Sequence, residues 1–497
     1  MKRWELELAY HERGQEIESL KGQLAERDLE IGRLRKRVED QEAVIAAQGV
    51  AIAELKAMVE ELRRAGHRQA GRFARDADRL TKDPKKPGRK PGQGTWSRRG
   101  EPSEEQKAKA VVKTSHLEAC PDCGGELADM LAHTHYEWDI PPVEPILTCF
   151  ESQSGYCDKC QRRQRSRHPD QISEATGAAG VVIGPHAKAL ASDMKHHLGL
   201  SYAKISAFFA VAFGMTFTRG GLYRADMRLA ARAGPVYREL IELVRQLAQV
   251  HVDETGWRIG TLSAWLWVFC GREVTVYTIR KSRGHEVVID ILGRTFRGIL
   301  TTDGLMTYDA AALADWLKQK CLAHILRHLK ALAASDSTAH RVLGTEMTSV
   351  LKDALALGRQ RCQLAAADYA AAAAHIEQRL DKLIADYPVD GDDDGARMVR
   401  HLTKHRDHLL RFLYVAGVEP TNNDAERGLR PGVITRKVGP CNRTEQGADA
   451  HSVLASIGAT CRKQGIPVID FLIRLQRATD DLPSIVSATP AASPAER

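Results

Sequence analysis

The sequence has few aromatic residues and no long apolar run, and each of these shortages narrows the possible classes of protein. Phe, Trp and Tyr make up 6% of the 497 residues, which fits a helix-rich chain with many Ala and Leu residues. No stretch approaches the roughly 18 apolar residues of a membrane-spanning helix. The N-terminal MKRWELELAY also lacks the apolar region of a secretory signal. We therefore expect a cytoplasmic protein with no membrane partner.

Charge and cysteine content indicate which partners to look for. The net charge of +8 mildly favours binding to polyanions such as nucleic acid. The ten cysteines include two Cys-x-x-Cys pairs, at positions 120/123 and 157/160. In a chain without an export signal, such pairs indicate metal binding rather than disulfides.

Changes in composition divide the chain into successive segments of an expected multidomain α+β protein. Pro and Gly break the pattern after residue 80, where a Lys/Arg run either lies along DNA or is a solvated tether. The segments are a coiled coil for oligomerisation (1–80), a basic flexible linker (81–106), a zinc-binding domain (107–170), a helical, helix-turn-helix-like segment (178–235), the first part of a mixed α/β core (247–334), a helical insertion (335–415), the C-terminal part of that core (416–480) and a disordered tail (481–497).

A heptad repeat runs through the first segment. Position d includes Leu20 and Leu34 but also the polar Arg27 and Gln41, which resist higher oligomers. A repeat of seven with β-branched residues at a and Leu at d favours a parallel, left-handed dimer. A single solvated helix that folds back on its own chain is the alternative. Position a is aliphatic throughout, at Ile17, Leu24, Ile31, Val38, Ile45, Ile52 and Val59.

The two cysteine pairs predict a structural zinc site. Two residues between cysteines allow both thiolates to reach one ion, and four thiolates complete a closed tetrahedral Zn²⁺ site. The 33 residues between the pairs, 124–156, leave room for strands at 135–140 and 145–150. A redox pair or two accidental pairs are the alternatives. The predicted ligands are Cys120, Cys123, Cys157 and Cys160, with His116, His133, His135 and Cys149 as substitutes.

A pair of helices follows the cysteine segment. Ser201 is placed to cap the first helix, Gly214 to make the turn and Thr218 to cap the second helix. This arrangement suits a helix-turn-helix with a recognition helix in the major groove of DNA. A hairpin packed on the catalytic core is the alternative. The predicted DNA contacts on the second helix are Arg219, Arg224 and Arg228.

The next region places acids at the ends of apolar strands. Asp253 ends the run QVHV, two strand-like runs and a helix follow, and Asp303 ends the run GILTT. The runs at 264–270 and 274–279 are separated by a Gly271 turn, which predicts an antiparallel meander. The order strand, strand, strand, helix, strand, helix is the layout of a ribonuclease-H-like domain.

Carboxylates in this layout suit metal-dependent chemistry on DNA. Two-metal cleavage of a phosphodiester needs acids that bridge and flank ions about 4 Å apart, and Mg²⁺ (or Mn²⁺) prefers such oxygen ligands. The best third acid is Glu426, on a helix that Asn422 or Asn423 can cap. Glu254 and Asp424 lie close enough in the sequence to be alternatives.

Basic residues cluster downstream of these acids and are expected to hold phosphate groups. Such contacts give strongly salt-dependent DNA binding. His324 and Arg327 can approach the scissile phosphate, although a structural hydrogen bond is an alternative role for His324. Tyr308 is expected to be a core or positioning residue rather than a nucleophile. The predicted phosphate contacts after Glu426 are Arg427, Arg430, Arg436, Lys437 and Arg443.

Four motifs then resemble a known family. VDETGW, TTDGLMTY, CLAHILRHL and NNDAERGLRP are similar, in the same order, to blocks of the insertion-sequence-66 family of bacterial DDE transposases. Asp253, Asp303 and Glu426 match the family's acidic triad one by one. The motif TTDGLMTY departs modestly from the family's usual residues. The resemblance implies DNA transposition, with transposon ends and target DNA as partners and small accessory proteins often employed.

The expected activity is that of a transposase that cuts the 3′ end of an insertion sequence and joins it to target DNA. Hydrolysis would free a 3′-hydroxyl, which then attacks the target in line at the same metals. Two other functions stay open. One is a DNA-binding regulator without catalysis, and the other is a metal nuclease that cuts without joining.

Overall fold

The structure is a computed structural model, and it divides into two compact units, Met1–Tyr136 and Glu137–Arg497. In the part of the chain that is described, no helix combines the length and apolar character needed to cross a membrane. Most of the expected linker and tail, at 81–100 and 486–497, lies outside the described residues. The described residues are 3–68, 101–116, 118–141, 143–172, 182–389, 391, 393–479 and 481–485.

The first unit contains helix α1 (Arg3–Arg68) and the short helix α3 (Glu104–Ala108). A capping box starts α3, since the Ser103 side chain and the Gln106 side chain each accept from the other's backbone N–H. Along α1, the a positions from Ile17 to Ile52 are 46–65% exposed. A continuous helix with an exposed aliphatic stripe at heptad spacing fits a coiled coil.

The cysteine region contains less regular structure than we expected. The strands predicted at 135–140 and 145–150 are wrong, because the described residues there make no ladder of backbone hydrogen bonds. An antiparallel hairpin forms instead from β1 (Ser154–Cys157) and β2 (Arg162–Arg165), around the second cysteine pair. Each strand of this hairpin has its partner close by across a tight turn, whereas the described residues of 135–140 and 145–150 have no such partner.

Three helices follow, and the caps of the second and third are those that the sequence predicted. They are α4 (Pro185–His196), α5 (Tyr202–Phe213) and α6 (Arg219–Arg245). Ser201 accepts from the Lys204 amide to cap α5, and Thr218 accepts from the Gly221 amide to cap α6. Gly214 ends α5 with φ of 63°, a left-handed conformation that glycine adopts without strain.

A mixed sheet forms the centre of unit 2. Among the described residues it has five strands in the order β5-β4-β3-β6-β7. β3 pairs antiparallel with β4, which pairs antiparallel with β5, so the predicted meander is present. On the other side β3 pairs parallel with β6, and β6 pairs parallel with β7. The strands are β3 (Gln249–Ile259), β4 (Leu262–Cys270), β5 (Thr275–Arg280), β6 (Ile299–Thr302) and β7 (Lys318–Lys320), with α7 (Glu286–Leu292) between β5 and β6.

Helices cover both faces of this sheet, as the alternation of its side chains requires. Trp267 and Phe269 of β4 pack with α6 and α7 in one cluster. Leu266 and Val268 point to the opposite face and pack with α12 (Asn423–Val438). The chain closes with α13 (Glu445–Lys463) and α14 (Val468–Arg477).

Helix α13 also covers the edge of the sheet. The backbone amides of Thr275, Tyr277 and Ile279 on the edge strand β5 donate to hydroxyls of α13. The three acceptors recur every four residues on one helix face, so they follow alternate residues of the strand. Exposed edge amides would otherwise invite pairing with another chain. The acceptors are Thr460, Ser456 and Ser452.

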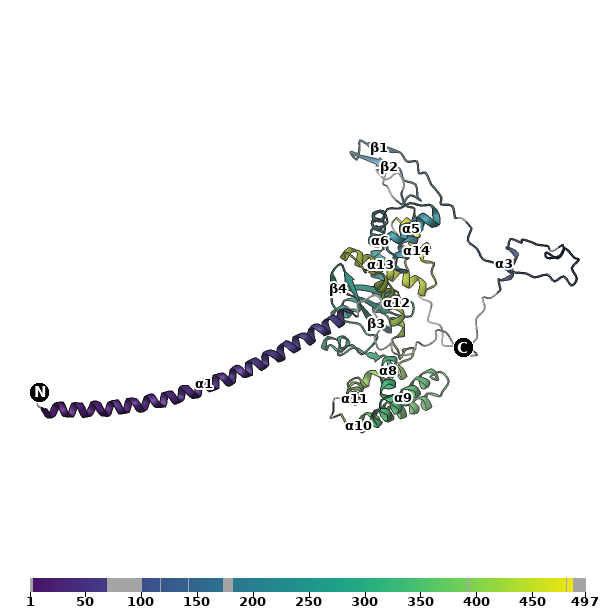
Figure 1. Ribbon diagram of the computed structural model, residues 1–497. Coiled ribbons are helices and arrows are strands. Elements are labelled where there is room, and N and C mark those ends of the chain that lie inside the picture. Colours follow the sequence, from purple (N-terminus) through teal and green to yellow (C-terminus); the bar gives the residue numbers. More distant parts are fainter. Residues whose placement is uncertain are drawn as a thin grey trace. The chain divides into compact units, whose positions relative to one another are not determined.

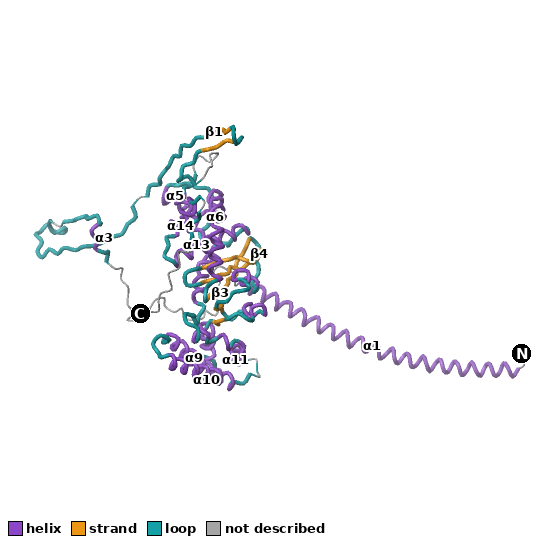
Figure 2. The backbone as a smooth tube through the Cα atoms, turned by 180° about the vertical axis from the view of Figure 1, so that it is seen from behind, coloured by secondary structure: helices purple, strands orange, loops and turns teal. Residues whose placement is uncertain are grey.

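The long stretch between β7 and α12 is helical and has its own core. Leu329 of α8 packs there with Met347 of α9 and Leu380 of α10. In Figures 1 and 2 these helices form a group at one end of unit 2, apart from the sheet helices. The elements are the 3₁₀ turns η1 (Met306–Asp309) and η2 (Ala311–Leu313), then α8 (Leu322–Ala333), α9 (Thr338–Arg359), α10 (Ala366–Asp386), α11 (Asp394–Lys404), η3 (Arg406–His408) and η4 (Arg411–Leu413).

Candidate active site

Asp253 lies within strand β3 rather than at its end, which corrects the sequence interpretation. β3 continues to Ile259 because residues 251–259 all pair with β4. The parallel partner β6 pairs only with residues 249–251. Asp253 therefore lies just beyond the point where β3 and β6 separate. An acid placed there faces the opening between two parallel strands, where ligands commonly bind.

The other two predicted acids flank this opening. Asp303 follows directly after β6 (Ile299–Thr302), and one of its carboxylate oxygens accepts from the Leu305 amide at 2.9 Å. Glu426 lies in the first turn of α12. Its Oε1 is 3.6 Å from Nε2 of His324, which comes from α8. The acids thus come from three chain segments that are distant in sequence.

Asn422 fixes the start of α12 beside β3, but not in the predicted way. Its side chain makes no capping bond to the helix. Its Nδ2 instead donates to the Val252 carbonyl at 2.8 Å, and its amide donates to Cys321 Sγ at 3.1 Å. Asn422 is fully buried, and its side chain is a strut, meaning that it joins the start of α12 to strand β3. The strut brings the first turn of α12, with Glu426, to the residue before Asp253.

The charges of the three acids act on one another. Burial, the largest cause, raises the pKa of Asp253 to about 7, with further increases from the charges of Glu254, Asp303 and Glu426. Like charges gathered in a partly buried place disfavour ionisation. Perturbed carboxyl groups of this kind are concentrated at functional sites. The arrangement costs stability unless cations enter it.

Glu254 is next to Asp253 in the sequence but has a different environment. Its side chain is 1% exposed, and its Oε1 accepts two hydrogen bonds from the Arg283 guanidinium, at 2.8 and 3.0 Å. Its Oε2 accepts from the Tyr308 hydroxyl at 2.7 Å. Both oxygens are thus engaged, and the fully buried Tyr308 is a core and positioning residue. No sequence pattern pointed to Arg283, whose guanidinium stacks on Trp265 with 4.3 Å to the ring centroid.

Asp424, the other alternative acid, is likewise engaged. Its Oδ2 accepts from Lys463 Nζ at 2.7 Å, and its Oδ1 lies 3.6 Å from Arg427. Lys463 belongs to α13, so this ion pair joins α12 to α13. The contrast with Glu426, whose partner is an imidazole, argues that Asp424 is structural.

The donor set of the three acids suits a hard divalent cation. No three acid, histidine or cysteine side chains of the described residues lie close enough together to hold a single ion. Mg²⁺ does not require three, because it retains several waters and is usually bound by one or two carboxylates plus substrate phosphate oxygens. A pair of ions would use Asp253 with Asp303 and Asp253 with Glu426. The residues fit magnesium on this ground.

Basic side chains lie exposed on α6 and on and just after α12, the helix that carries Glu426. Arg436 additionally donates to the Gly256 carbonyl at 3.0 Å, which ties the end of α12 to β3. Exposed side chains can reach a phosphate backbone, whereas a buried cation could not. The exposed basic residues are Arg427, Arg430, Arg436, Lys437 and Arg443 around α12 and Arg219, Arg224 and Arg228 on α6.

Each cysteine pair forms a turn of its own. Sγ of Cys160 is 3.2 Å from Sγ of Cys157, and the Cys160 amide lowers the pKa of the Cys157 thiol. The amides of Asp122 and Cys123 lower the pKa of the Cys120 thiol in the same way. A lowered pKa favours the thiolate, which is the metal-binding form. The two pairs belong to different compact units.

Comparison with known proteins places the chain in a family. The model of the Transposase IS66 family matches residues 180–450. Two proteins of Sinorhizobium fredii (strain NBRC 101917 / NGR234), both named as uncharacterized, are similar. Protein y4qI is 27% identical over 270 residues, which are 47% of this chain and about half, 48%, of the relative. Protein y4jD is 23% identical over 392 residues, 72% of this chain and 73% of the relative. The family match includes all three acids and more than half of the chain, which therefore belongs to the Transposase IS66 family.

Proposed function

We propose that the protein is a DDE transposase that uses divalent metal ions to cut transposon ends and join them to target DNA. The observation that carries this proposal is the grouping of Asp253, Asp303 and Glu426 from three segments, with the pKa of Asp253 raised to about 7. Glu254 and Asp424 have their oxygens engaged by cationic or hydroxyl partners, which supports the assignment of the other acids as ligands.

The sheet order supports a ribonuclease-H-like catalytic core. The antiparallel strands β3, β4 and β5 are followed by β6 and β7, which add in parallel on the other side of β3. The sequence predicted the order of the elements and the antiparallel meander, but not the parallel pairing, in this sheet. The sheet order puts the first acid on the central strand and the second at the end of its parallel neighbour.

The residues of the chain have separate roles in the proposed mechanism. Asp253, Asp303 and Glu426 would hold the divalent ions, with Asp253 on the central strand between the segments that carry the other two acids. When bound, the divalent ions activate the attacking oxygen and stabilise the leaving oxygen. His324, at 3.6 Å from Glu426, orients that carboxylate. The arginines of α12 hold the DNA backbone in register with the acids.

A strand-transfer assay tests the proposal. Purified protein is incubated with Mg²⁺, labelled DNA carrying the element's own ends, and a target plasmid. We expect wild type to cut and join, Asp253→Asn to bind the ends without either reaction, and the exposed control Asp449→Asn to behave as wild type. Cutting without joining of precut ends would indicate a nuclease. DNA binding by wild type with no cutting or joining, even after extract is added, would indicate a regulator and contradict the proposal.

We also propose that DNA is contacted by α6 and by the segment after Glu426. The three arginines near the start of α6 are exposed. Helices α5 and α6 are joined by a short turn, and Ser201 and Thr218 cap their N-termini, as in the predicted helix-turn-helix. Contacts to phosphate release counterions, so binding should weaken steeply with salt. Replacing Arg224 and Arg228 by Ala should reduce the slope of affinity against salt by about two charges.

For the cysteines we propose one structural zinc ion bound by Cys120, Cys123, Cys157 and Cys160. The lowered pKa values of Cys120 and Cys157 support metal binding by each pair. If both pairs share one ion, Cys120→Ser and Cys157→Ser should each remove most of the bound zinc, as measured by elemental analysis. Retention of zinc in either variant would contradict a shared site.

Self-association through α1 is proposed on the exposed a positions, with a second copy of this chain as the partner. A transposase must hold two DNA ends together, and a parallel dimer would supply the two active sites. The family resemblance also suggests small accessory proteins, which the strand-transfer assay would reveal if activity requires added extract.

A further inference from the structure

A buried charge cluster joins the helical insertion to the loop that carries Asp303. Lys320, at the end of β7, has a side chain that is 2% exposed, and its Nζ is 3.0 Å from Oδ1 of Asp309. The same Nζ donates to the main-chain carbonyl of Asp303 at 3.3 Å. Lys320 pairs in register with Thr302, the residue before Asp303. Lys320 thus touches the main chain at the proposed metal ligand.

The second oxygen of Asp309 faces the insertion. Lys404, the last residue of α11, places its Nζ 2.8 Å from Oδ2 of Asp309, and His405 Nε2 lies 3.4 Å from the same atom. Burial and the charge of Lys320 lower the pKa of His405 to about 4, so its ring is neutral near neutral pH. The cationic partners of Asp309 are therefore the two lysines. His401 of α11 also lies against Gly304, the residue after Asp303.

We propose that Asp309 is a positioning residue through which α11 sets the place of Asp303, so that the helical insertion is part of the metal-binding apparatus. The inference rests on the proposed function of Asp303. Asp309 receives one lysine from the sheet and one from the insertion, and it lies six residues after Asp303 in the sequence. If Lys404 is withdrawn, α11 loses its charged link to this loop.

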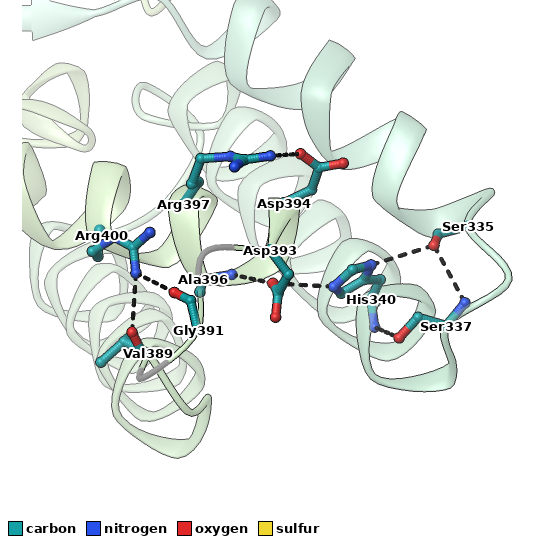
Figure 3. Close-up of polar contacts among 10 residues, drawn as sticks. All are labelled: Ser335, Ser337, His340, Val389, Gly391, Asp393, Asp394, Ala396, Arg397 and Arg400. Atoms are coloured by element: carbon teal, nitrogen blue, oxygen red, sulfur yellow. Dashed lines mark hydrogen bonds and ion pairs between the residues drawn. The ribbon is translucent and has the colours of Figure 1, made fainter. Parts of the chain in front are cut away.

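Helix α11 is also anchored at its N-terminal end, opposite to Lys404. Figure 3 shows Asp393, the cap of α11, accepting from the Ala396 amide at 2.8 Å and contacting His340 of α9 at 3.1 Å. Arg400 donates to the carbonyls of Val389 and Gly391 at 3.0 and 2.7 Å. These bonds hold the start of α11 in place, so the helix presents Lys404 to Asp309 from an anchored position.

A purely stabilising role is the main competing explanation, and the choice of variant separates the two. Asp309→Asn would leave the buried Lys320 without its carboxylate, which itself endangers folding. Lys404 is 57% exposed, so Lys404→Glu leaves the Lys320–Asp309 pair intact while repelling Asp309. Lys404→Met removes the contact without repulsion and is the second variant. Lys382→Glu, on the exposed surface of α10 in the same insertion, makes the same charge change as a control.

The test is the binding of Mn²⁺ to the full-length protein without DNA, followed by electron paramagnetic resonance of the free ion. Adding a negative charge near the acids should, by simple electrostatics, tighten cation binding. Misplacement of Asp303 predicts the opposite, a loss of about tenfold or more in Lys404→Glu and a smaller loss in Lys404→Met. Lys404→Arg should restore binding, and Lys382→Glu should bind as wild type.

Hydrogen exchange at 303–310 gives a second readout that does not depend on metal or activity. We expect faster exchange of these amides in Lys404→Glu and not in Lys382→Glu. Unchanged exchange together with unchanged or tighter Mn²⁺ binding would overturn the inference. A wild type that binds no Mn²⁺ but shows the exchange difference would instead contradict the proposed function and leave the link from α11 to the loop in place.

Discussion

Aliphatic side chains are exposed on helix α1 but buried in the sheet of unit 2. Val250 and Val252 of β3 are fully buried, whereas Ile31 and Ile45 of α1 are 46% and 65% exposed. The apolar side chains of the sheet are packed in a core, but the acids at its centre repel one another. The helix is complete in its backbone hydrogen bonds but leaves an apolar stripe in water. We therefore propose one partner for each region, a cation for the acids and a second copy of α1 for the stripe.

The largest expected effect is on unfolding of the sheet region. Trp267 is fully buried between Phe269 and Tyr308. Trp267→Ala should lower the free energy of unfolding by about 3–5 kcal/mol, because a large cavity is left in a packed core. Ile31→Ala should change the unfolding of unit 2 very little. Chemical denaturation of both variants, followed by tryptophan fluorescence, would measure the difference. Equal losses in the two variants would contradict the comparison.

The next effect is on self-association. Replacing Leu24 and Ile31 with Lys places four charges in the seam of a dimer and should abolish it. Replacing the exposed Glu26 and Arg33, which lie outside positions a and d, with Gln is the matched control and should leave the dimer intact. Analytical ultracentrifugation gives the mass. A wild type that sediments as a monomer would support the alternative of a helix without a second copy.

A smaller effect is expected in the pH dependence of cleavage. The charge of Glu254 is, after burial, the largest cause of the raised pKa of Asp253. Glu254→Gln keeps an acceptor for Arg283 but removes this charge, so the pKa of Asp253 should fall. The ionised form that binds metal would then be present at lower pH. The acidic limb of the rate–pH profile should move to lower pH, and a shift to higher pH would contradict the electrostatic argument.

Sequence reasoning located the acids and the elements that present them because these depend on local pattern. The strands around Asp253, the caps at Ser201 and Thr218, and the helical stretch after β7 all follow from periodicity or short-range bonds. The bond from Asn422 to Val252 joins residues 170 positions apart, and no local pattern encodes it. The charge cluster of Asp309 was missed for the same reason.

The errors have a physical cause as well. The segments 135–140 and 145–150 are predicted as strands, but a strand needs a hydrogen-bonded partner, which composition alone does not supply. Asp253 was placed at a strand end because polar residues follow it. The β4 ladder holds those residues in the strand as far as Ile259.

The central claim is that the acids around Asp253 are gathered for a metal and not for stability. The raised pKa means that ionisation of Asp253 opposes folding, so stability is lost as pH rises from about 4 towards about 7. The most direct measurement is the melting temperature of wild type and Asp253→Asn at about pH 8, with and without Mg²⁺. We expect Asp253→Asn to melt higher than wild type without metal and to gain nothing from Mg²⁺, while wild type is stabilised by it. A variant that melts lower than wild type without metal, or one that is stabilised by Mg²⁺ as much as wild type, would contradict the claim.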